Sequence, residues 1–329
     1  MRLLCLTFLL FSFQSLFAQD TFSIVAYDSE TGEVGSAGAS CLDNVQFPGS
    51  NGAFIISDVI PGRGAIHTQS FYIEANQNAA RNRLMMGDNA SEIITWLTRN
   101  DAEFRPAVRQ YGIVTVDAEG NVDAAAYTGE ECFDWKGQRV NSSKYAIQGN
   151  ILLGEEIVNN MEIAFNRTEG TLADKLMAVM QAANVPGADS RCLDEGVSSL
   201  SAFLRVAKPT DSADDLYLDL NVPGTPFGVE PIDELQNLYD EFLLTNTEEL
   251  AALDWQIYPN PVKDELQIKL PVAASQLTIF DALGRVVEQL PMESTEVLLS
   301  TQNWDNGLYF LQITNAQQQS GYRRVLKVE

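Results

Sequence analysis

The sequence predicts an α+β protein with a larger mixed domain followed by a small all-β domain. Its 329 residues exceed one average domain of roughly 150 residues. Up to residue 245, hairpin patterns and amphipathic helices occur without regular strand–helix–strand crossovers, which favours antiparallel sheets covered by helices. From Trp255 onward, short β segments alternate with turns and helical periodicity almost disappears, as in a small β-sandwich.

The strands of the larger domain are predicted mainly as hairpins. In 21–40, Phe22, Ile24 and Ala26 alternate with Ser23, Val25 and Tyr27 up to a turn at 28–32. The return strand consists of Gly, Ala and Ser. Such small side chains leave room for close packing or for a ligand against the backbone. A second hairpin is predicted at 111–127. Further strands are predicted at 53–59, 64–71, 200–206 and 216–222.

Amphipathic periodicity predicts the helices. The segment 91–99 places Ile93, Ile94 and Leu97 on one face. Thr171 and Asp174 have the spacing of a capping box at the start of a later helix, and Pro231 precedes the last one. The five predicted helices span 74–86, 91–99, 157–165, 172–183 and 232–243. The polar, acidic stretch that follows, 246–254, is predicted to be a linker.

Residues 1–18 have the pattern of a signal peptide. Arg2 precedes an apolar run, and the small residue Ala18 precedes Gln19 and Asp20. The run is too short and too interrupted for a membrane anchor, and no later stretch is apolar enough to span a membrane. The 45 acidic and 21 basic residues give a net charge of −24, which disfavours nucleic acid as a partner and suits solubility outside the cell.

The C-terminal segment carries four motifs: YPNPVKDELQI at 258–268, TIFDALGRVV at 278–287, NGLYFLQI at 306–313 and RRVLKVE at 323–329. In these motifs it resembles the type A C-terminal sorting domain of the type IX, or Por, secretion system of Bacteroidetes. The resemblance implies handling by the type IX secretion machinery and transport through the periplasm. The expected destination is the medium or the outer-membrane surface of a bacterium, with removal of the domain on the way. The alternative is an ordinary accessory β module.

The larger domain carries seven motifs: TFSIVAYDSETGEVGSAGAS at 21–40, GRGAIHTQSF at 62–71, YGIVTVDAEGNV at 111–122, YTGEECFDWKG at 127–137, YAIQGNILLG at 145–154, GADSRCLDEGVSSLSAFLRVA at 187–207 and DDLYLDLNV at 214–222. In these motifs it resembles a bacterial family of unknown function in the N-terminal nucleophile (Ntn) hydrolase superfamily, and the resemblance spans 21–245. It implies a four-layer αββα sandwich. The expected domains are therefore a signal peptide at 1–18, an Ntn-hydrolase-like domain at 19–245, a linker at 246–254 and a sorting domain at 255–329.

Thr21 is the candidate nucleophile that this resemblance implies. In Ntn hydrolases the first residue of the mature chain attacks the substrate, and its own α-amine, with a pKa near 8, accepts the hydroxyl proton. Cleavage after Ala18 would leave Gln19 and Asp20 in front of Thr21, whose nitrogen would then be an amide. Two more residues must be removed for this mechanism. Otherwise Thr21 is a β-favouring residue at a strand start.

Other polar residues are expected near sheet ends, where each could line a pocket or simply occupy a turn. His67, the single histidine, would be needed for a Ser-His-Asp triad but lies in an alternating strand, where a structural role is the commoner one. The motifs of metal and nucleotide sites do not occur, so no metal and no cofactor are expected. The remaining candidates are Asp28, Gln69, Gln148, Asn150, Asp189, Arg191, Ser199 and Ser201.

Three cysteines remain after signal-peptide cleavage: Cys41, Cys132 and Cys192. In an oxidising compartment they allow one internal disulfide and one thiol, and the spacing does not say which two pair. A nucleophilic cysteine would need His67 as its base, and no spacing links the two. Two functions remain open: an Ntn-type amide hydrolase acting on an unknown small-molecule or peptide substrate, and a non-catalytic extracellular binding module on the same fold.

Overall fold

The computed structural model describes residues 21–251, 255–270, 276–282, 284–292, 294–314 and 320–328, without the side chains of 244–251. The chain divides into two compact units between Leu238 and Tyr239. The predicted signal peptide at 1–18 lies outside the described residues.

A six-stranded antiparallel sheet forms the centre of the first unit, with the order β10-β9-β2-β1-β8-β7. The predicted N-terminal hairpin is confirmed as β1 and β2, the two central strands of this sheet. The strands β7 and β8 were not predicted from periodicity. The bounds are β1 Thr21–Tyr27, β2 Val34–Ser40, β7 Gly137–Asn141, β8 Tyr145–Gly149, β9 Ser201–Ala207 and β10 Leu218–Val222.

A second, four-stranded antiparallel sheet has the order β3-β4-β5-β6. The hairpin predicted at 111–127 is confirmed as β5 and β6. The strand predicted at 53–59 is wrong in its first half, because Gly52–Ile56 forms the 3-10 helix η1, entered through Asn51 and Gly52 with positive φ. The bounds are β3 Ser57–Ile60, β4 Gly64–Gln69, β5 Gln110–Val116 and β6 Val122–Thr128.

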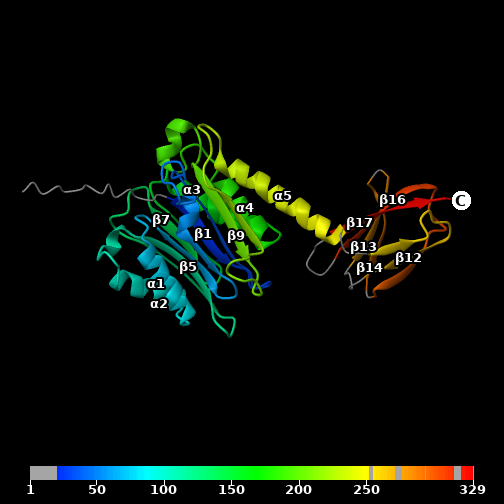
Figure 1. Cartoon of the computed structure of the whole chain (residues 1–329), viewed down its shortest axis with the longest axis horizontal. Helices are drawn as coiled ribbons and strands as arrows, with labels where there is room; N and C mark the ends of the chain where they lie inside the picture. The colour runs from blue at the N-terminus through cyan, green and yellow to red at the C-terminus, as the bar shows by residue number, and fades with distance from the viewer. Residues whose placement is uncertain are drawn as a thin grey trace, which may run out of the picture. The chain divides into compact units, whose positions relative to one another are not determined.

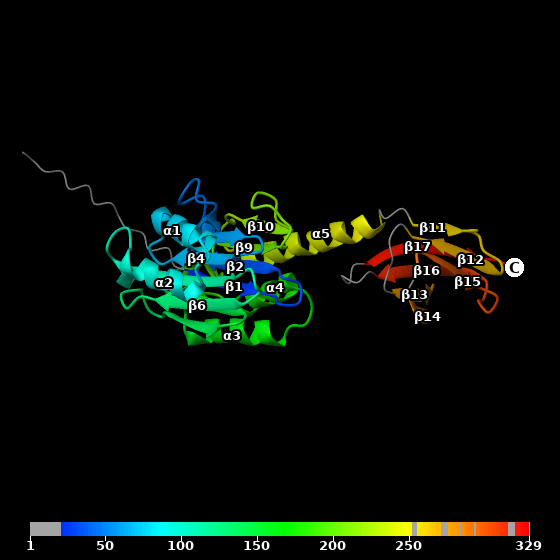
Figure 2. The ribbon, with the colours of Figure 1, turned by 90° about the horizontal axis from the view of Figure 1, so that it is seen from below.

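Helices cover the outer faces of both sheets. The helices α1 (Glu74–Met85) and α2 (Ala90–Arg99) pack on β4, β5 and β6, whereas α3 (Glu155–Arg167) and α4 (Leu172–Ala182) pack on the six-stranded sheet. The two sheets face each other, as Figures 1 and 2 show from two directions. The predicted αββα sandwich is confirmed.

Local sequence signals explain where two of these helices start. At α2 the side chain of Asn89 accepts from the backbone N–H of Glu92, whose carboxylate accepts from the backbone N–H of Asn89. The predicted capping box of α4 is confirmed between Thr171 and Asp174. The small side chains of β2 serve close packing, because a Cβ at Gly35 would lie 2.4 Å from Cδ1 of Leu176 on α4.

The helix predicted at 232–243 is longer than expected. The helix α5 spans Pro231–Ala251, so most of the stretch expected to be a linker at 246–254 is helical. Glu, Leu and Ala in this stretch are good helix formers, which explains why the helix continues into it. The role of 246–254 as a linker stays a prediction.

The second unit is a β-sandwich of two antiparallel sheets, ordered β11-β12-β15 and β14-β13-β16-β17. The inward side chains of both sheets form one core, which includes Leu266, Leu299, Leu311 and Val325. The bounds are β11 Gln256–Tyr258, β12 Glu265–Lys269, β13 Gln276–Asp281, β14 Val286–Pro291, β15 Glu296–Ser300, β16 Gly307–Thr314 and β17 Ser320–Lys327. The predicted all-β domain is confirmed. Among the described residues, no helix is long and apolar enough to cross a membrane.

Candidate active site between the two sheets

Thr21 is the first residue of β1, and its side chain faces the second sheet. Alternate residues of a strand share a face, and Ser23, two residues on, donates to the side chain of Gln69 on β4 at 2.6 Å. Val25, two residues further, packs against the facing sheet next to Val114. Thr21 is buried, and its Oγ1 atom has no hydrogen-bond partner among the described residues.

Three carboxamides surround Thr21 in the space between the sheets. The backbone N–H of Asn150, just after β8, donates to the carbonyl oxygen of Thr21 at 3.2 Å, and Nε2 of Gln69 donates to the same oxygen at 3.1 Å. Gln69 also donates to Oε1 of Gln110 at 2.7 Å, and Asn150 Nδ2 donates to that oxygen at 2.9 Å. All four residues are buried. We call Thr21, Gln69, Gln110 and Asn150 the amide layer.

A second polar layer lies two residues further along β1, at Ser23. Nε2 of Gln148 donates to Oγ of Ser23 at 2.6 Å and lies 3.3 Å from Nδ1 of His67. Nε2 of His67 is 2.6 Å from Oγ of Ser36, which is 2.7 Å from Oγ of Ser57. A continuous hydrogen-bonded chain therefore links β3 to the start of β1.

The direction of the hydrogen bonds in the amide layer follows from two backbone carbonyls. Nε2 of Gln110 donates to the oxygens of Gly149 at 2.9 Å and of Gly137 at 3.3 Å, which can only accept. Oε1 of Gln110 must then face Gln69 and Asn150, and both present their nitrogens to it. Consequently Oδ1 of Asn150 points elsewhere, and no described residue donates to it.

The tautomer of His67 follows from its hydrogen-bond partners in the same way. Gln69 Oε1 receives the hydroxyl proton of Ser23, so the oxygen of Ser23 accepts from Gln148. The amide nitrogen of Gln148 also faces Nδ1 of His67, which leaves the ring proton on Nε2, donated to Ser36. Burial, followed by the positive charge of Arg205, lowers the pKa of His67 from 6.5 to about 3, so the ring is neutral.

This setting does not suit His67 as the base of a Ser-His-Asp triad. The hydrogen-bond partners of its ring are Ser36 and Gln148, and neither is a carboxylate. His67 and Ser36 are both fully buried. The structural role favoured by the sequence agrees with these contacts.

A buried ion pair holds the turn that follows Gln69. Ser70 and Phe71 have φ of 55° and 54°, a left-handed conformation that residues other than glycine rarely adopt. Arg109 donates to the carbonyl oxygen of Phe71 and to Oδ2 of Asp101, the latter at 2.8 Å. Burial alone would raise the pKa of Asp101, but hydrogen bonds from Arg109 and its neighbours hold it well below its usual range.

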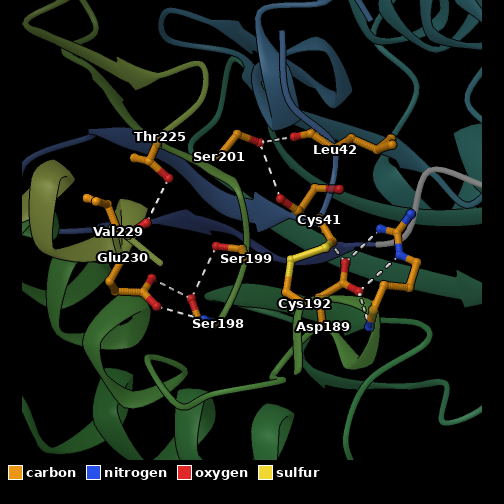
Figure 3. The surroundings of a disulfide bond; sticks show 12 residues. Cys41, Leu42, Asp189, Cys192, Ser198, Ser199, Ser201, Thr225, Val229 and Glu230 are labelled. Atoms are coloured by element: carbon orange, nitrogen blue, oxygen red, sulfur yellow. Dashed lines mark hydrogen bonds and ion pairs between the residues drawn. A yellow bond between two sulfur atoms is a disulfide. The ribbon is translucent and has the colours of Figure 1, made fainter. Parts of the chain in front are cut away.

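A disulfide joins two loops at the same end of the sandwich. Cys41, one residue past the β2 partner of Thr21, is bonded to Cys192 with the Cα atoms 5.8 Å apart. The backbone N–H of Cys41 donates to the buried carboxylate of Asp189 at 2.9 Å, and Arg191 forms an ion pair with that carboxylate at 2.7 Å. Figure 3 shows the disulfide with Asp189 beside it. Cys132 keeps its thiol, which donates to the carbonyl oxygen of Arg109 at 3.3 Å.

The remaining predicted candidates lie apart from the amide layer. Asp28 caps the turn at the other end of β1, where its Oδ1 accepts from the backbone N–H of Glu30. The hydroxyl of Ser201 accepts a hydrogen bond from the backbone N–H of Ala53 in η1 and donates to the carbonyl oxygen of Leu42. The hydroxyl of Ser199 lies 3.1 Å from that of Ser198. Figure 3 shows both serines near the disulfide.

Three cavities bordered by described residues lie away from the amide layer. One of about 400 Å³ is bordered by the α1–α2 loop and the β5–β6 turn, one of about 460 Å³ lies on α1 and α2, and one of about 230 Å³ lies beside Asp28. Thr21 borders none of these three. Within the described residues, no group of three or more histidine, cysteine, aspartate or glutamate side chains is arranged to hold a metal ion.

Sequence reasoning missed several residues of this site, above all Gln110, Ser23 and Ser36. Each occupies an inward position of its strand, and Ser23 stands on the more polar side of the alternating pattern, the side that sequence alone assigns to solvent. Polar residues at inward positions of two paired strands are the signal that could have identified them.

Two packed antiparallel sheets with helices on both outer faces, and a buried amide layer at the start of the central strand, define the first unit as an αββα sandwich protein. Residues 21–235 match the family of unknown function DUF1028, and the chain belongs to this family. Residues 256–327 match the secretion system C-terminal sorting domain of the Por type. The protein is therefore secreted to the cell surface or beyond it.

A solved structure supports the family assignment. The crystal structure of a DUF1028 protein from Silicibacter pomeroyi is 26% identical, with a TM-score of 0.52, and the match covers 68% of this chain and 88% of that one. A surface component of the type IX secretion system of Porphyromonas gingivalis matches at 13% identity and a TM-score of 0.23 over 39% of this chain and 21% of its own. The comparison with curated proteins found no match.

Proposed function

We propose that the first unit is an amide hydrolase of the N-terminal nucleophile type, with Thr21 as the nucleophile. One observation supports this above the others: Thr21 heads the central strand with a buried hydroxyl that has no partner among the described residues. A buried polar atom without a partner costs about 1–3 kcal/mol, and such costs concentrate at functional sites. The match to the family also begins at Thr21.

The reaction would proceed through an acyl-enzyme. The Thr21 hydroxyl oxygen attacks the carbonyl carbon of a substrate amide while the α-amine of Thr21 takes the hydroxyl proton. The amine then gives this proton to the leaving nitrogen as the C–N bond breaks. Water attacks the resulting ester with the same amine as base, which releases the carboxylic acid and restores Thr21.

The surroundings of Thr21 suit an amine that must remain unprotonated. The other members of the amide layer, Gln69, Gln110 and Asn150, are neutral, and His67 in the next layer is held neutral by burial. An ammonium group gains no opposite charge within these two layers, so desolvation would lower its pKa from the usual value near 8.

The N-terminus of the secreted protein tests the proposal. We expect mass spectrometry of the mature chain to show Thr21 as the first residue, after removal of Gln19 and Asp20. An N-terminal Gln19, or a pyroglutamate formed from it, would leave no amine on Thr21 and would refute the mechanism.

A covalent probe provides a second test on the mature chain. A β-lactone should acylate the Thr21 hydroxyl and add its full mass to the peptide that begins at Thr21. The matched control is Thr21→Val, which has nearly the same shape and no hydroxyl, and it should not react at this residue. Equal labelling of both would show that the probe reacts elsewhere.

A further inference from the structure

At the start of β1, two neighbouring strand positions each carry a buried side-chain oxygen that has no partner among the described residues. Phe22 pairs with Gly149, so the next pair in the same register is Thr21 with Asn150, joined by the 3.2 Å backbone hydrogen bond. Side chains at such directly opposite positions have Cβ atoms about 4.5–5.5 Å apart. Oγ1 of Thr21 and Oδ1 of Asn150 both lack a partner among the described residues, and both side chains are fully buried.

The donors of the neighbouring carboxamides are already used. Nε2 of Gln69 donates to Gln110 and to the Thr21 carbonyl, and Nε2 of Gln110 donates to two backbone oxygens. Oδ1 of Asn150 cannot exchange places with Nδ2, because Nδ2 is required by Oε1 of Gln110. Oδ1 of Asn150 is therefore an acceptor in a fixed position, and no carboxamide of the amide layer donates a hydrogen bond to it.

Removal of the residues before Thr21 would create new N–H donors at this position. The backbone amide of Thr21 has one N–H, whereas the amine of an N-terminal threonine has at least two. We propose that Asn150 is the positioning residue of the nucleophile: its Oδ1 accepts a hydrogen bond from the N-terminal amine of Thr21 and holds the lone pair of that amine toward Oγ1. This role rests on the proposed function.

The charged groups around this position lie next to the amide layer and not within it. Asp189, paired with Arg191, binds the N–H of Cys41, one residue past the β2 partner of Thr21. Asp101 and Arg109 hold the carbonyl of Phe71, two residues past Gln69. A charge introduced at Asn150 would therefore act on the amine more directly than the charges already present.

The experiment measures the pKa of the Thr21 amine. A chain that begins at Thr21 is released from a cleavable fusion partner, and the amine is titrated by competitive acetylation and mass spectrometry. Asn150→Asp places a carboxylate next to the amine and should raise its pKa by about 1–3. Asn150→Ala removes the acceptor that favours the charged form and should lower the pKa below that of the parent chain.

A matched control separates this contact from a general change of charge. Asn141→Asp, in the turn at the far end of the β7–β8 hairpin, changes the net charge equally and should leave the pKa of the amine unchanged. Circular dichroism shows which variants fold. If Asn150→Asp does not fold, Asn150→Ala decides the question.

An amine pKa that is the same in the parent and in every folded Asn150 variant would overturn the proposal. The proposed function can fail separately. Because the chain beginning at Thr21 is made directly, a natural N-terminus at Gln19 would refute the nucleophile and would leave the measured contact standing.

Discussion

At the scale of single residues, the interior of the first unit is unusual for the polar groups that it contains. Ser23, Ser36, His67, Gln69 and Gln148 are buried between two sheets, where apolar side chains are the rule. They remain stable there because most of their polar atoms have hydrogen-bond partners. Among the described residues, the buried side-chain atoms without a partner include Oγ1 of Thr21, Oδ1 of Asn150 and Oε1 of Gln148, which lie in or next to the amide layer. These three atoms point to the site more directly than the most reactive residue types do.

His67 should make the stability of the fold depend on pH. Because its pKa is about 3 in the folded protein and near 6.5 in the unfolded chain, the unfolded chain binds the proton more readily. The contribution of neutral His67 to the free energy of unfolding is fully present above pH 6.5 and is lost as the pH falls toward 3. The histidine contribution should decrease by about 2 kcal/mol from pH 8 to pH 5.

Urea denaturation of the wild type and of His67→Gln at several pH values measures this contribution. The variant has no ring to protonate, so the difference in unfolding free energy between the two proteins should shrink on acidification. Parallel pH profiles would contradict the neutral assignment of His67.

At the scale of strands, alternation arranges the space between the sheets in successive layers. The inward positions of β1 are Thr21, Ser23 and Val25, and the facing strand β4 contributes Gln69, His67 and Ala65 in the same order. The space is therefore polar at the start of β1 and apolar toward its end. The polar groups at one end mark the candidate site, and the apolar layer supplies packing energy.

Gly112 is the residue of β5 that makes room for the second layer. A Cβ at this position would lie 1.9 Å from Oε1 of Gln148, while the backbone itself has no positive φ. Gly112→Ala should therefore displace Gln148, break its contact with His67 and cost about 1–3 kcal/mol by overpacking.

The double variant Gly112→Ala with Gln148→Ala tests the cause of that cost. Removing the Gln148 carboxamide makes space for the new methyl group, so the double variant should lose less stability than the sum of the two single variants. Thermal or urea denaturation measures all three proteins. Strictly additive costs would show that Gly112 matters for another reason.

At the scale of the whole molecule, the two units have different charge and different roles. Residues 255–329 contain six basic and eight acidic residues, so nearly all of the net charge of −24 belongs to the rest of the chain. The sorting domain has its own hydrophobic core around Trp255 and Leu311. It can therefore fold as an export signal without using the residues of the amide layer.

Deletion of 255–329 should stop export and leave the protein in the periplasm. The cut follows the end of α5 at Ala251, so the truncated chain keeps the whole helix. Fractionation with antibody against the first unit locates the protein. As a control, 255–329 fused to an unrelated periplasmic protein should carry it to the cell surface, and surface appearance of the truncated chain would refute the role of this domain.

Local signals in the sequence predicted much of the fold. Alternation and turn residues located the first hairpin, and the Thr171–Asp174 spacing located the start of α4, because these signals act over a few residues. The strands β7 and β8 were missed because they are short and one carries Gln138 and Arg139 in place of an apolar run. The helix α5 continues to Ala251, into the stretch for which the acidic composition predicted a linker.

By itself, the sequence determined the class of the fold, the sorting domain and the position of Thr21 at a strand start. Only the tertiary structure decided that Cys41 pairs with Cys192, 151 residues away, and that Gln69, Gln110 and Asn150 meet around Thr21. The physical reason is the range of the interactions. Propensity and periodicity act between near neighbours in the chain, whereas a hydrogen-bonded layer between two sheets depends on the register of strands that are far apart in the sequence.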